Sequence, residues 1–148
     1  MQTSVYEPGY ARREMDRKVG LLAHVPLFST LDQRSMEAVA TLAREVALPA
    51  GTVLMREGEP AESFYLIVTG TVRVQRAGAP VRSLSDGGFL GEIALVEQGE
   101  RTATATCVTD CQLLVLGSFE FDRVMATFPE IRARVSAAVA RRPHAGGR

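Results

Sequence analysis

Apolar and polar residues alternate in the middle of the chain, along 72–75 and again along 102–107. A period of two is expected of strands that bury one face. Other short runs rich in Val, Leu, Thr and Tyr are set apart by Gly and Pro, and together the predicted strands are 53–55, 64–69, 71–75, 81–84, 102–108 and 113–116. Short strands at regular spacing with turn signals between them predict a sandwich or barrel of the jelly-roll type over 46–117.

Helical periodicity replaces this alternation on both sides. Before the strands, the apolar residues at helical spacing are Met36, Val39, Ala40 and Ala43. Thr30 and Gln33 fit a capping box at the start of this helix, which we expect to end near Glu45. After the strands, Ser118 is a suitable N-cap, and Pro129 suits the first turn of a further helix. Apolar stripes follow at Phe121, Val124, Met125 and Phe128, and at Ile131, Val135, Ala138 and Val139.

These patterns divide the chain into a loose, charged arm over 1–17, one domain over 18–142 and a polar tail over 143–148. Within the domain, helices are predicted over 18–45, the jelly roll over 46–117 and C-terminal helices over 118–142. The predicted fold class is mainly β with flanking helices: a double-stranded β-helix (jelly roll) with N-terminal helices and C-terminal lid helices.

Composition narrows the classes of protein to consider. The chain has 148 residues, 46% of them hydrophobic and 23% charged, with a formal net charge of zero. These values are typical of one globular domain, and they disfavour a general nucleic-acid binder, which needs a basic surface. The apolar runs are too short for a transmembrane helix, and no signal peptide is recognisable. We therefore expect no membrane insertion and a cytoplasmic location.

The sequence shows no pattern typical of a metal site or of covalent catalysis. The two cysteines, Cys107 and Cys111, flank a predicted hairpin turn. Because no further ligand lies nearby in sequence, we predict buried thiols and not a metal site. No nucleophile stands in a recognisable pattern with a base. We therefore expect no catalytic residue, no metal and no cofactor.

Gly91 and Glu92 stand at the start of a short apolar segment, 92–96, that interrupts the strand pattern. We expect a single helical turn here, whose exposed N–H groups attract an anion. Gly91 would let the anion approach the backbone, and Arg101 could pair with a phosphate from across the loop. Glu92 would repel the anion unless a ligand hydroxyl donates to it, which favours a ligand with both a phosphate and a sugar. The alternative is an internal Glu92–Arg101 ion pair without a ligand.

Gly91–Val96, followed by Arg101–Thr104, resembles the phosphate-binding cassette of cyclic nucleotide-binding domains. This family includes catabolite activators, kinase regulatory subunits and cyclic-nucleotide-gated channels. The resemblance extends over about 22–142, and its other motifs are 25–28, 49–51, 56–58, 65–70 and 128–129. Glu100 departs from the family pattern, since many members have proline before this arginine.

The resemblance implies a role for each matching residue. Glu92 would accept the ribose 2′-hydroxyl, and Arg101 would pair with the exocyclic oxygens of the cyclic phosphate. The backbone donors of the anion cradle would be those around Gly91, Ile93, Ala94, Thr102 and Ala103. The residues facing the base would be Val74, Arg82 and Leu84, with Arg142 reaching over it from the last helix. We expect cAMP as the ligand. Because the Thr102 hydroxyl can also reach the amino group of a syn guanine, cGMP stays open as a second ligand.

The function so implied is a stand-alone cyclic nucleotide sensor, not an enzyme. Helices from Ser118 onward would move as a lid and signal to an unidentified effector protein or through a homodimer. DNA binding is not expected, because the roughly thirty residues after the strands leave no room for a helix-turn-helix domain. The alternatives are a ligand-free interaction or dimerisation module on the same fold, and a mixed-dimer partner of a full-length regulator. In the sensor, Arg101→Ala should weaken binding and leave the melting temperature nearly unchanged, whereas in the ligand-free module it should destabilise the protein.

Overall fold

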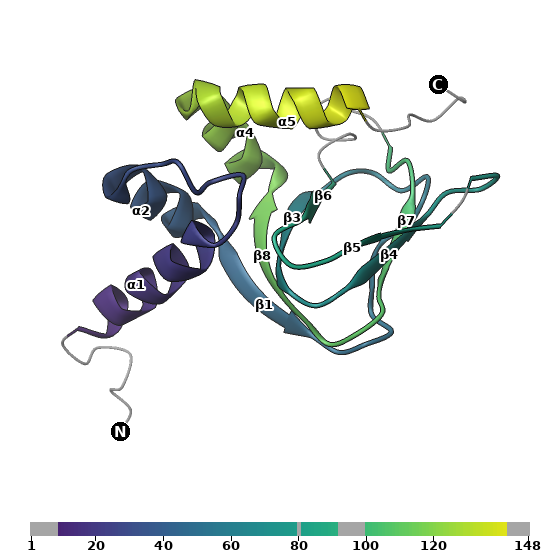
Figure 1. Ribbon diagram of the computed structural model, residues 1–148, viewed down its shortest axis with the longest axis horizontal. Helices are drawn as coiled ribbons and strands as arrows, with labels where there is room; N and C mark the ends of the chain where they lie inside the picture. Colours follow the sequence, from purple (N-terminus) through teal and green to yellow (C-terminus); the bar gives the residue numbers. More distant parts are fainter. Residues whose placement is uncertain (1–8, 80, 92–99, 142–148) are drawn as a thin grey trace.

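The computed structural model describes residues 9–79, 81–91 and 100–141, in which helices come before and after a strand-rich middle (Figure 1). The helices are α1 (Tyr10–Ala23), α2 (Gln33–Leu42), α4 (Ser118–Thr127) and α5 (Pro129–Arg141). The strands are β1 (Arg44–Leu48), β2 (Val53–Met55), β3 (Ser63–Thr69), β4 (Val72–Gln75), β5 (Arg82–Leu84), β6 (Phe89–Leu90), β7 (Thr104–Cys107) and β8 (Cys111–Gly117).

The strands form two four-stranded sheets, in the orders β1-β8-β3-β6 and β2-β7-β4-β5. Every pairing between these strands is antiparallel. The chain passes repeatedly from one sheet to the other, since β1, β3, β6 and β8 belong to the first sheet and the strands between them to the second. This arrangement confirms the predicted jelly roll with flanking helices.

Alternation along β3 creates two separate cores. Phe64 and Leu66 are fully buried on the side of the helices, where they join apolar residues of α1, α2, α4 and α5. Ile67 is fully buried on the opposite side, between the two sheets, and Tyr65 packs against that second cluster. Because successive side chains of a strand point to opposite faces, β3 serves both cores at once. It therefore connects the helices to the interior of the barrel.

Residues 10–17 of the predicted loose arm are helical, because α1 begins at Tyr10. Long-range charge contacts hold this helix in place. Arg17 donates to both carboxylate oxygens of Glu45 at 3.0 and 2.7 Å, and Lys18 donates to the carbonyl of Ala43 at 2.8 Å. These partners lie more than twenty residues away in sequence, so the local pattern showed only a cluster of solvated charges.

The predicted helix boundaries need three corrections. The N-cap of α2 is Asp32, whose side chain accepts from the Ser35 backbone N–H at 2.8 Å, so the Thr30–Gln33 capping box is wrong. That hydrogen bond also lowers the pKa of Asp32. The same helix ends at Leu42, and the segment expected to finish it near Glu45 pairs as β1 with β8. Ser118 is the first helical residue of α4, and its N-cap is Gly117.

The turn between the two cysteines is not a hairpin, because β7 and β8 belong to different sheets. The prediction of buried thiols is confirmed, since Cys107 and Cys111 are both buried and unbridged. Burial, together with the neighbouring Cys111 thiol, raises the pKa of Cys107 to about 11. Within the described ranges, no His, Cys, Asp or Glu residues gather in a group of three able to hold a metal ion. None of the helices described is long and apolar enough to cross a bilayer.

Candidate functional site

Arg101 enters the site from a loop that is tied to the β2–β3 connection. Its backbone N–H donates to the carbonyl of Glu59 at 2.7 Å, and its carbonyl accepts from the Gly58 N–H at 2.9 Å. The preceding residue, Glu100, is exposed and forms an isolated antiparallel bridge with Pro60. These main-chain contacts fix the point from which the arginine side chain extends.

The Arg101 side chain is buried, with only 5% of the residue exposed. Its Nη1 donates to the carbonyl of Gly91 at 3.0 Å, and its Nη2 donates to the carbonyl of Ser63 at 2.5 Å. The guanidinium carbon lies 5.9 Å from the centre of the Tyr65 ring. Removing a charged group from water is costly unless polar partners receive its donors. The two carbonyls receive one donor from each terminal nitrogen and so orient the guanidinium.

Gly91 is the position where only glycine fits this arrangement. Its φ is +97°, a region that L side chains rarely adopt, and an added Cβ would lie 2.8 Å from the Ser63 oxygen and 2.9 Å from Arg101 Nη1. The approach of these groups follows from the pairing of β3 with β6, which places Tyr65 opposite Leu90. The sequence suggested that Gly91 clears space for an anion; the structure adds that it clears space for the arginine.

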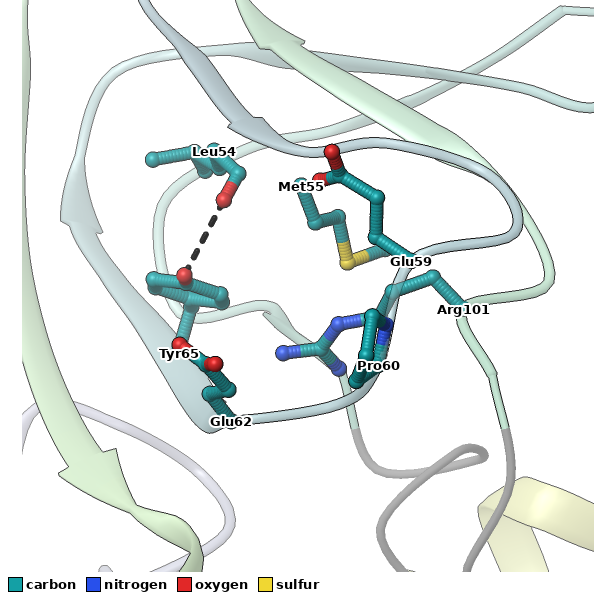
Figure 2. A pocket seen from close by; sticks show the side chains of 7 residues that line it. All are labelled: Leu54, Met55, Glu59, Pro60, Glu62, Tyr65 and Arg101. Atoms are coloured by element: carbon teal, nitrogen blue, oxygen red, sulfur yellow. Dashed lines mark hydrogen bonds between the residues drawn. The ribbon is translucent and has the colours of Figure 1, made fainter.

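A pocket of about 300 Å³ opens beside Arg101, and Figure 2 shows the guanidinium directed into it. Its lining consists of Leu54, Met55, Glu59, Pro60, Glu62, Tyr65 and Arg101. The Tyr65 hydroxyl donates to the carbonyl of Leu54 at 3.1 Å, which ties β3 to β2 across the pocket. The carboxylates of Glu59 and Glu62 belong to exposed residues. Sequence reasoning missed Tyr65 as a site residue, because its partner Arg101 is far away in the chain.

The residues predicted to face the base gather on the inner face of the second sheet. In the pairing of β4 with β5, Val74 lies opposite Arg82 and Val72 lies opposite Leu84. Directly paired residues share one face of an antiparallel sheet, so Arg82 lies on the face of the buried Val74 although Arg82 itself is exposed. Leu84 packs against the core between the sheets.

Two further residues of the predicted cassette follow Arg101 in the chain. Ala103 is buried in the core between the sheets, and Thr102 is half-buried between Ala103 and Arg101. The structure thus brings Gly91 and Arg101 into direct contact, and Arg101 is the one described residue of the predicted site that lines the pocket. Glu92, Ile93, Ala94 and Arg142, together with the helical turn predicted over 92–96, lie outside the described residues.

Residues 45–128, more than half of the chain, match the family model of the cyclic nucleotide-binding domain. The chain belongs to the cyclic nucleotide-binding domain family. Its similarity to the human potassium/sodium hyperpolarization-activated cyclic nucleotide-gated channel 3 is 37% identity over 113 residues, which is 76% of this chain and 15% of the channel. The chain therefore spans a small part of this relative's length. The region 45–128 that matches the family model contains Gly91, Arg101 and helix α4.

Solved structures share the fold of this cyclic nucleotide-binding domain at low sequence identity. The regulatory domain of Toxoplasma gondii PKA with cAMP superposes with a TM-score of 0.82 at 20% identity, over 95% of this chain and 55% of that one. The regulatory subunit of a cAMP-independent protein kinase A from Trypanosoma brucei superposes with a TM-score of 0.80 at 19% identity, over 90% of this chain and 48% of that one. These two neighbours establish the fold, and because one is a complex with cAMP and the other belongs to a cAMP-independent kinase, the fold alone does not decide the ligand.

Proposed function

We propose that this domain is a cyclic nucleotide sensor, regulatory and not catalytic, whose C-terminal helices transmit the bound state to a partner protein. The observation that carries the proposal is the buried guanidinium of Arg101, aimed into a pocket and oriented by the carbonyls of Ser63 and Gly91. A guanidinium oriented in this way is suited to a phosphate, to which arginine can donate two parallel hydrogen bonds. The stand-alone character, the cytoplasmic location and the homodimer expected from the sequence stay predictions.

In this proposal the nucleotide lies along the inner face of the second sheet. Arg101 pairs with the exocyclic phosphate oxygens, and Glu92 accepts the ribose 2′-hydroxyl. Backbone donors near Gly91, Ile93, Ala94, Thr102 and Ala103 complete the anion cradle. The base packs against Val74 and Leu84, which present apolar surface on that face. Arg142 reaches over the base from the end of the last helix.

Three consecutive residues, the last before β3 and the first two of β3, connect this site with the C-terminal helices. The carbonyl of Glu62 accepts from the Ser118 N–H, the first of α4, at 2.9 Å. The carbonyl of Ser63 accepts from Arg101 at 2.5 Å. The ring of Phe64 then packs on Phe121 of α4, with ring centres 5.0 Å apart. A shift of Arg101 on phosphate binding would therefore act on residues that α4 contacts directly.

A ligand moves the helices only to the extent that it binds their two arrangements with different free energy. The helix pair has a second anchor, since Arg134 of α5 donates to the carbonyl of Leu27 at 2.8 Å. Repositioning α5 would require this bond to break or to move with the turn. The Phe64–Phe121 contact and the Arg134–Leu27 bond are thus the two places where we expect the signal to appear.

The ligand we propose first is cAMP, in keeping with the cAMP bound by the structurally similar Toxoplasma gondii regulatory domain. Two residues favour cGMP as a second candidate ligand. Arg82 lies on the inner face, and an arginine can donate to both N7 and O6 of guanine. Thr102 is half-buried beside Arg101, where its hydroxyl could meet a syn guanine. Both nucleotides therefore belong in the test.

Isothermal titration of the full chain with cAMP and with cGMP tests the proposal directly. The sensor should release or absorb heat with at least one of them and should melt at a higher temperature in its presence. The open-chain 5′-AMP is a matched control for the cyclic phosphate, and Arg101→Ala is the matched control for the site. If millimolar cAMP and cGMP produce neither heat nor a thermal shift, the sensor proposal is wrong.

The ligand-free interaction or dimerisation module remains the second candidate, because Arg101 also has structural contacts of its own. The bonds to Ser63 and Gly91 imply that Arg101→Ala destabilises the free protein in either case. The expectation of a nearly unchanged melting temperature is therefore revised, and the stability of this variant no longer separates the two functions. Ligand titration does, and size-exclusion chromatography reports the dimer.

A further inference from the structure

We propose that Tyr65 is a positioning residue of the nucleotide site, which holds the guanidinium of Arg101 ready for the phosphate. This inference rests on the proposed function. Tyr65 is not part of the cassette around Gly91 and Arg101, and the motif 65–70 that contains it was predicted only as a strand and turn. Its role follows from the pairing of its backbone, the hydrogen bond of its hydroxyl and the contact of its ring with Arg101.

The backbone of Tyr65 is fixed on both sides. It lies in the middle of β3, opposite Leu90 of β6 and opposite Val115 of β8. A residue paired on both sides of its strand has little freedom to translate, since a shift would break the ladder of hydrogen bonds. The base of the tyrosine side chain is therefore an immobile point within the sheet.

The far end of the same side chain is also fixed. The hydroxyl donates to the carbonyl of Leu54 in β2 at 3.1 Å, a bond drawn as a dashed line in Figure 2. Leu54 belongs to the other sheet, so the ring spans the space between the two sheets. With its Cα held in β3 and its hydroxyl held on β2, the ring keeps one orientation beside the pocket.

Arg101 lies against this immobile ring. The guanidinium carbon is 5.9 Å from the ring centre, within the range of about 6 Å in which a cation is attracted to the face of an aromatic ring. The carbonyls of Ser63 and Gly91 receive its two terminal nitrogens. Ring and carbonyls together restrict a side chain that otherwise has many rotamers, and less entropy is then lost when a phosphate binds.

The test is a double-mutant cycle between Tyr65 and Arg101, with cAMP affinity as the readout. Tyr65→Leu removes the ring and should weaken cAMP binding by about threefold to thirtyfold, the range expected for a partly desolvated cation on a ring. Tyr65→Phe keeps the ring and should stay within about threefold of the wild type. In an Arg101→Lys background, where the planar guanidinium is gone, Tyr65→Leu should lose clearly less than it does in the wild type.

Controls separate positioning from loss of fold. Val68→Ala truncates a half-buried residue of the same strand that packs in the helix-side core. It should lower the melting temperature and leave cAMP affinity unchanged. Should Tyr65→Leu fail to fold, Tyr65→Ile removes the same ring with a side chain that strands favour.

The outcomes are distinct. If the wild type binds neither cAMP nor cGMP, the proposed function fails, and this inference fails with it. If the wild type binds while Tyr65→Leu binds equally well, or loses the same factor in both backgrounds, only the positioning role is overturned. If Tyr65→Phe is as weak as Tyr65→Leu, the hydroxyl bond to Leu54 carries the whole effect and the ring contact carries none, and the proposal is equally wrong.

Discussion

Replacing Gly91 with alanine should destabilise the free protein and weaken its binding of cAMP. The added Cβ would meet the Ser63 carbonyl oxygen at 2.8 Å and Arg101 Nη1 at 2.9 Å, closer than real Cβ contacts allow. One of those groups is the main chain of Ser63, which is paired with Gly117 of β8 and cannot easily retreat. We therefore expect the arginine to be displaced from its position between the two carbonyls.

The size of the effect has two parts. A non-glycine residue at φ +97° costs roughly 1–3 kcal/mol of backbone strain. Overpacking against fixed neighbours adds about 1–3 kcal/mol. Gly51 separates the two parts, because its φ of +93° is nearly the same while nothing lies within 4 Å of an added Cβ. Gly51→Ala should therefore show the strain alone, and Gly91→Ala the strain and the steric conflict together.

Thermal unfolding and cAMP titration of both variants measure these parts. For a domain of this size each kcal/mol lowers the melting temperature by about 2–4 °C, so Gly91→Ala should melt several degrees below Gly51→Ala. A hydrogen bond from a charged donor is worth about 1.5–3 kcal/mol, so loss of the Arg101–Gly91 bond should weaken cAMP binding about tenfold or more. Gly51→Ala should bind as the wild type does.

Equal melting temperatures for the two variants would show that the space around Gly91 is not restricted in the way described. A normal melting difference combined with cAMP affinity within about twofold of the wild type would be a separate contradiction. It would mean that the position of Arg101 between Ser63 and Gly91 is irrelevant to the ligand.

Three further predictions concern other parts of the molecule. Arg82→Ala should reduce the affinity for cGMP more than that for cAMP, and equal losses in parallel titrations would contradict a role beside the base. Arg17 lowers the pKa of Glu45 below its ordinary value of 4.5, so the pair stabilises the fold above that pH and loses its effect as the pH falls through the lowered pKa. Urea unfolding of the wild type and Glu45→Gln should accordingly differ at neutral pH and converge in acid, whereas a constant difference would refute the linkage. Burial raises the pKa of Cys107 to about 11. Its thiol should therefore resist iodoacetamide in the native protein at neutral pH and react after unfolding, as mass spectrometry can show.

Much of the fold could be predicted because the spacing of apolar residues along the chain indicates helices and strands locally. The alternation along β4 and β7 identified these strands, since each buries one face between the sheets. The sequence did not predict β1, because its residues are half-buried or exposed without a regular alternation. The extent of α1 could not be predicted for a related reason. Arg17 is held by Glu45, and these two residues are neighbours only in the folded chain.

The candidate site divides in the same way. Gly91, Arg101 and Ala103 carry a recognisable spacing, and the structure brings Gly91 and Arg101 into contact while Ala103 is buried between the sheets. What holds Arg101 could not be predicted, because two of its partners are carbonyl oxygens and every residue has one. The Tyr65 ring carries a chemical signal of its own, but only the pairing of β3 with β6 and β8 brings it beside the arginine.

The use of main-chain oxygens has a consequence for how the chain can change. At position 63 the arginine contacts the carbonyl, so what matters is the path of the strand and not the side chain that the strand presents. Residue 63 is therefore free to drift among the amino acids that strands accept while the arginine keeps its place. Residue 91 has no such freedom, because a Cβ would occupy the space of the contact itself. Libraries built to alter ligand preference can accordingly randomise the first of these positions and should keep the second as glycine.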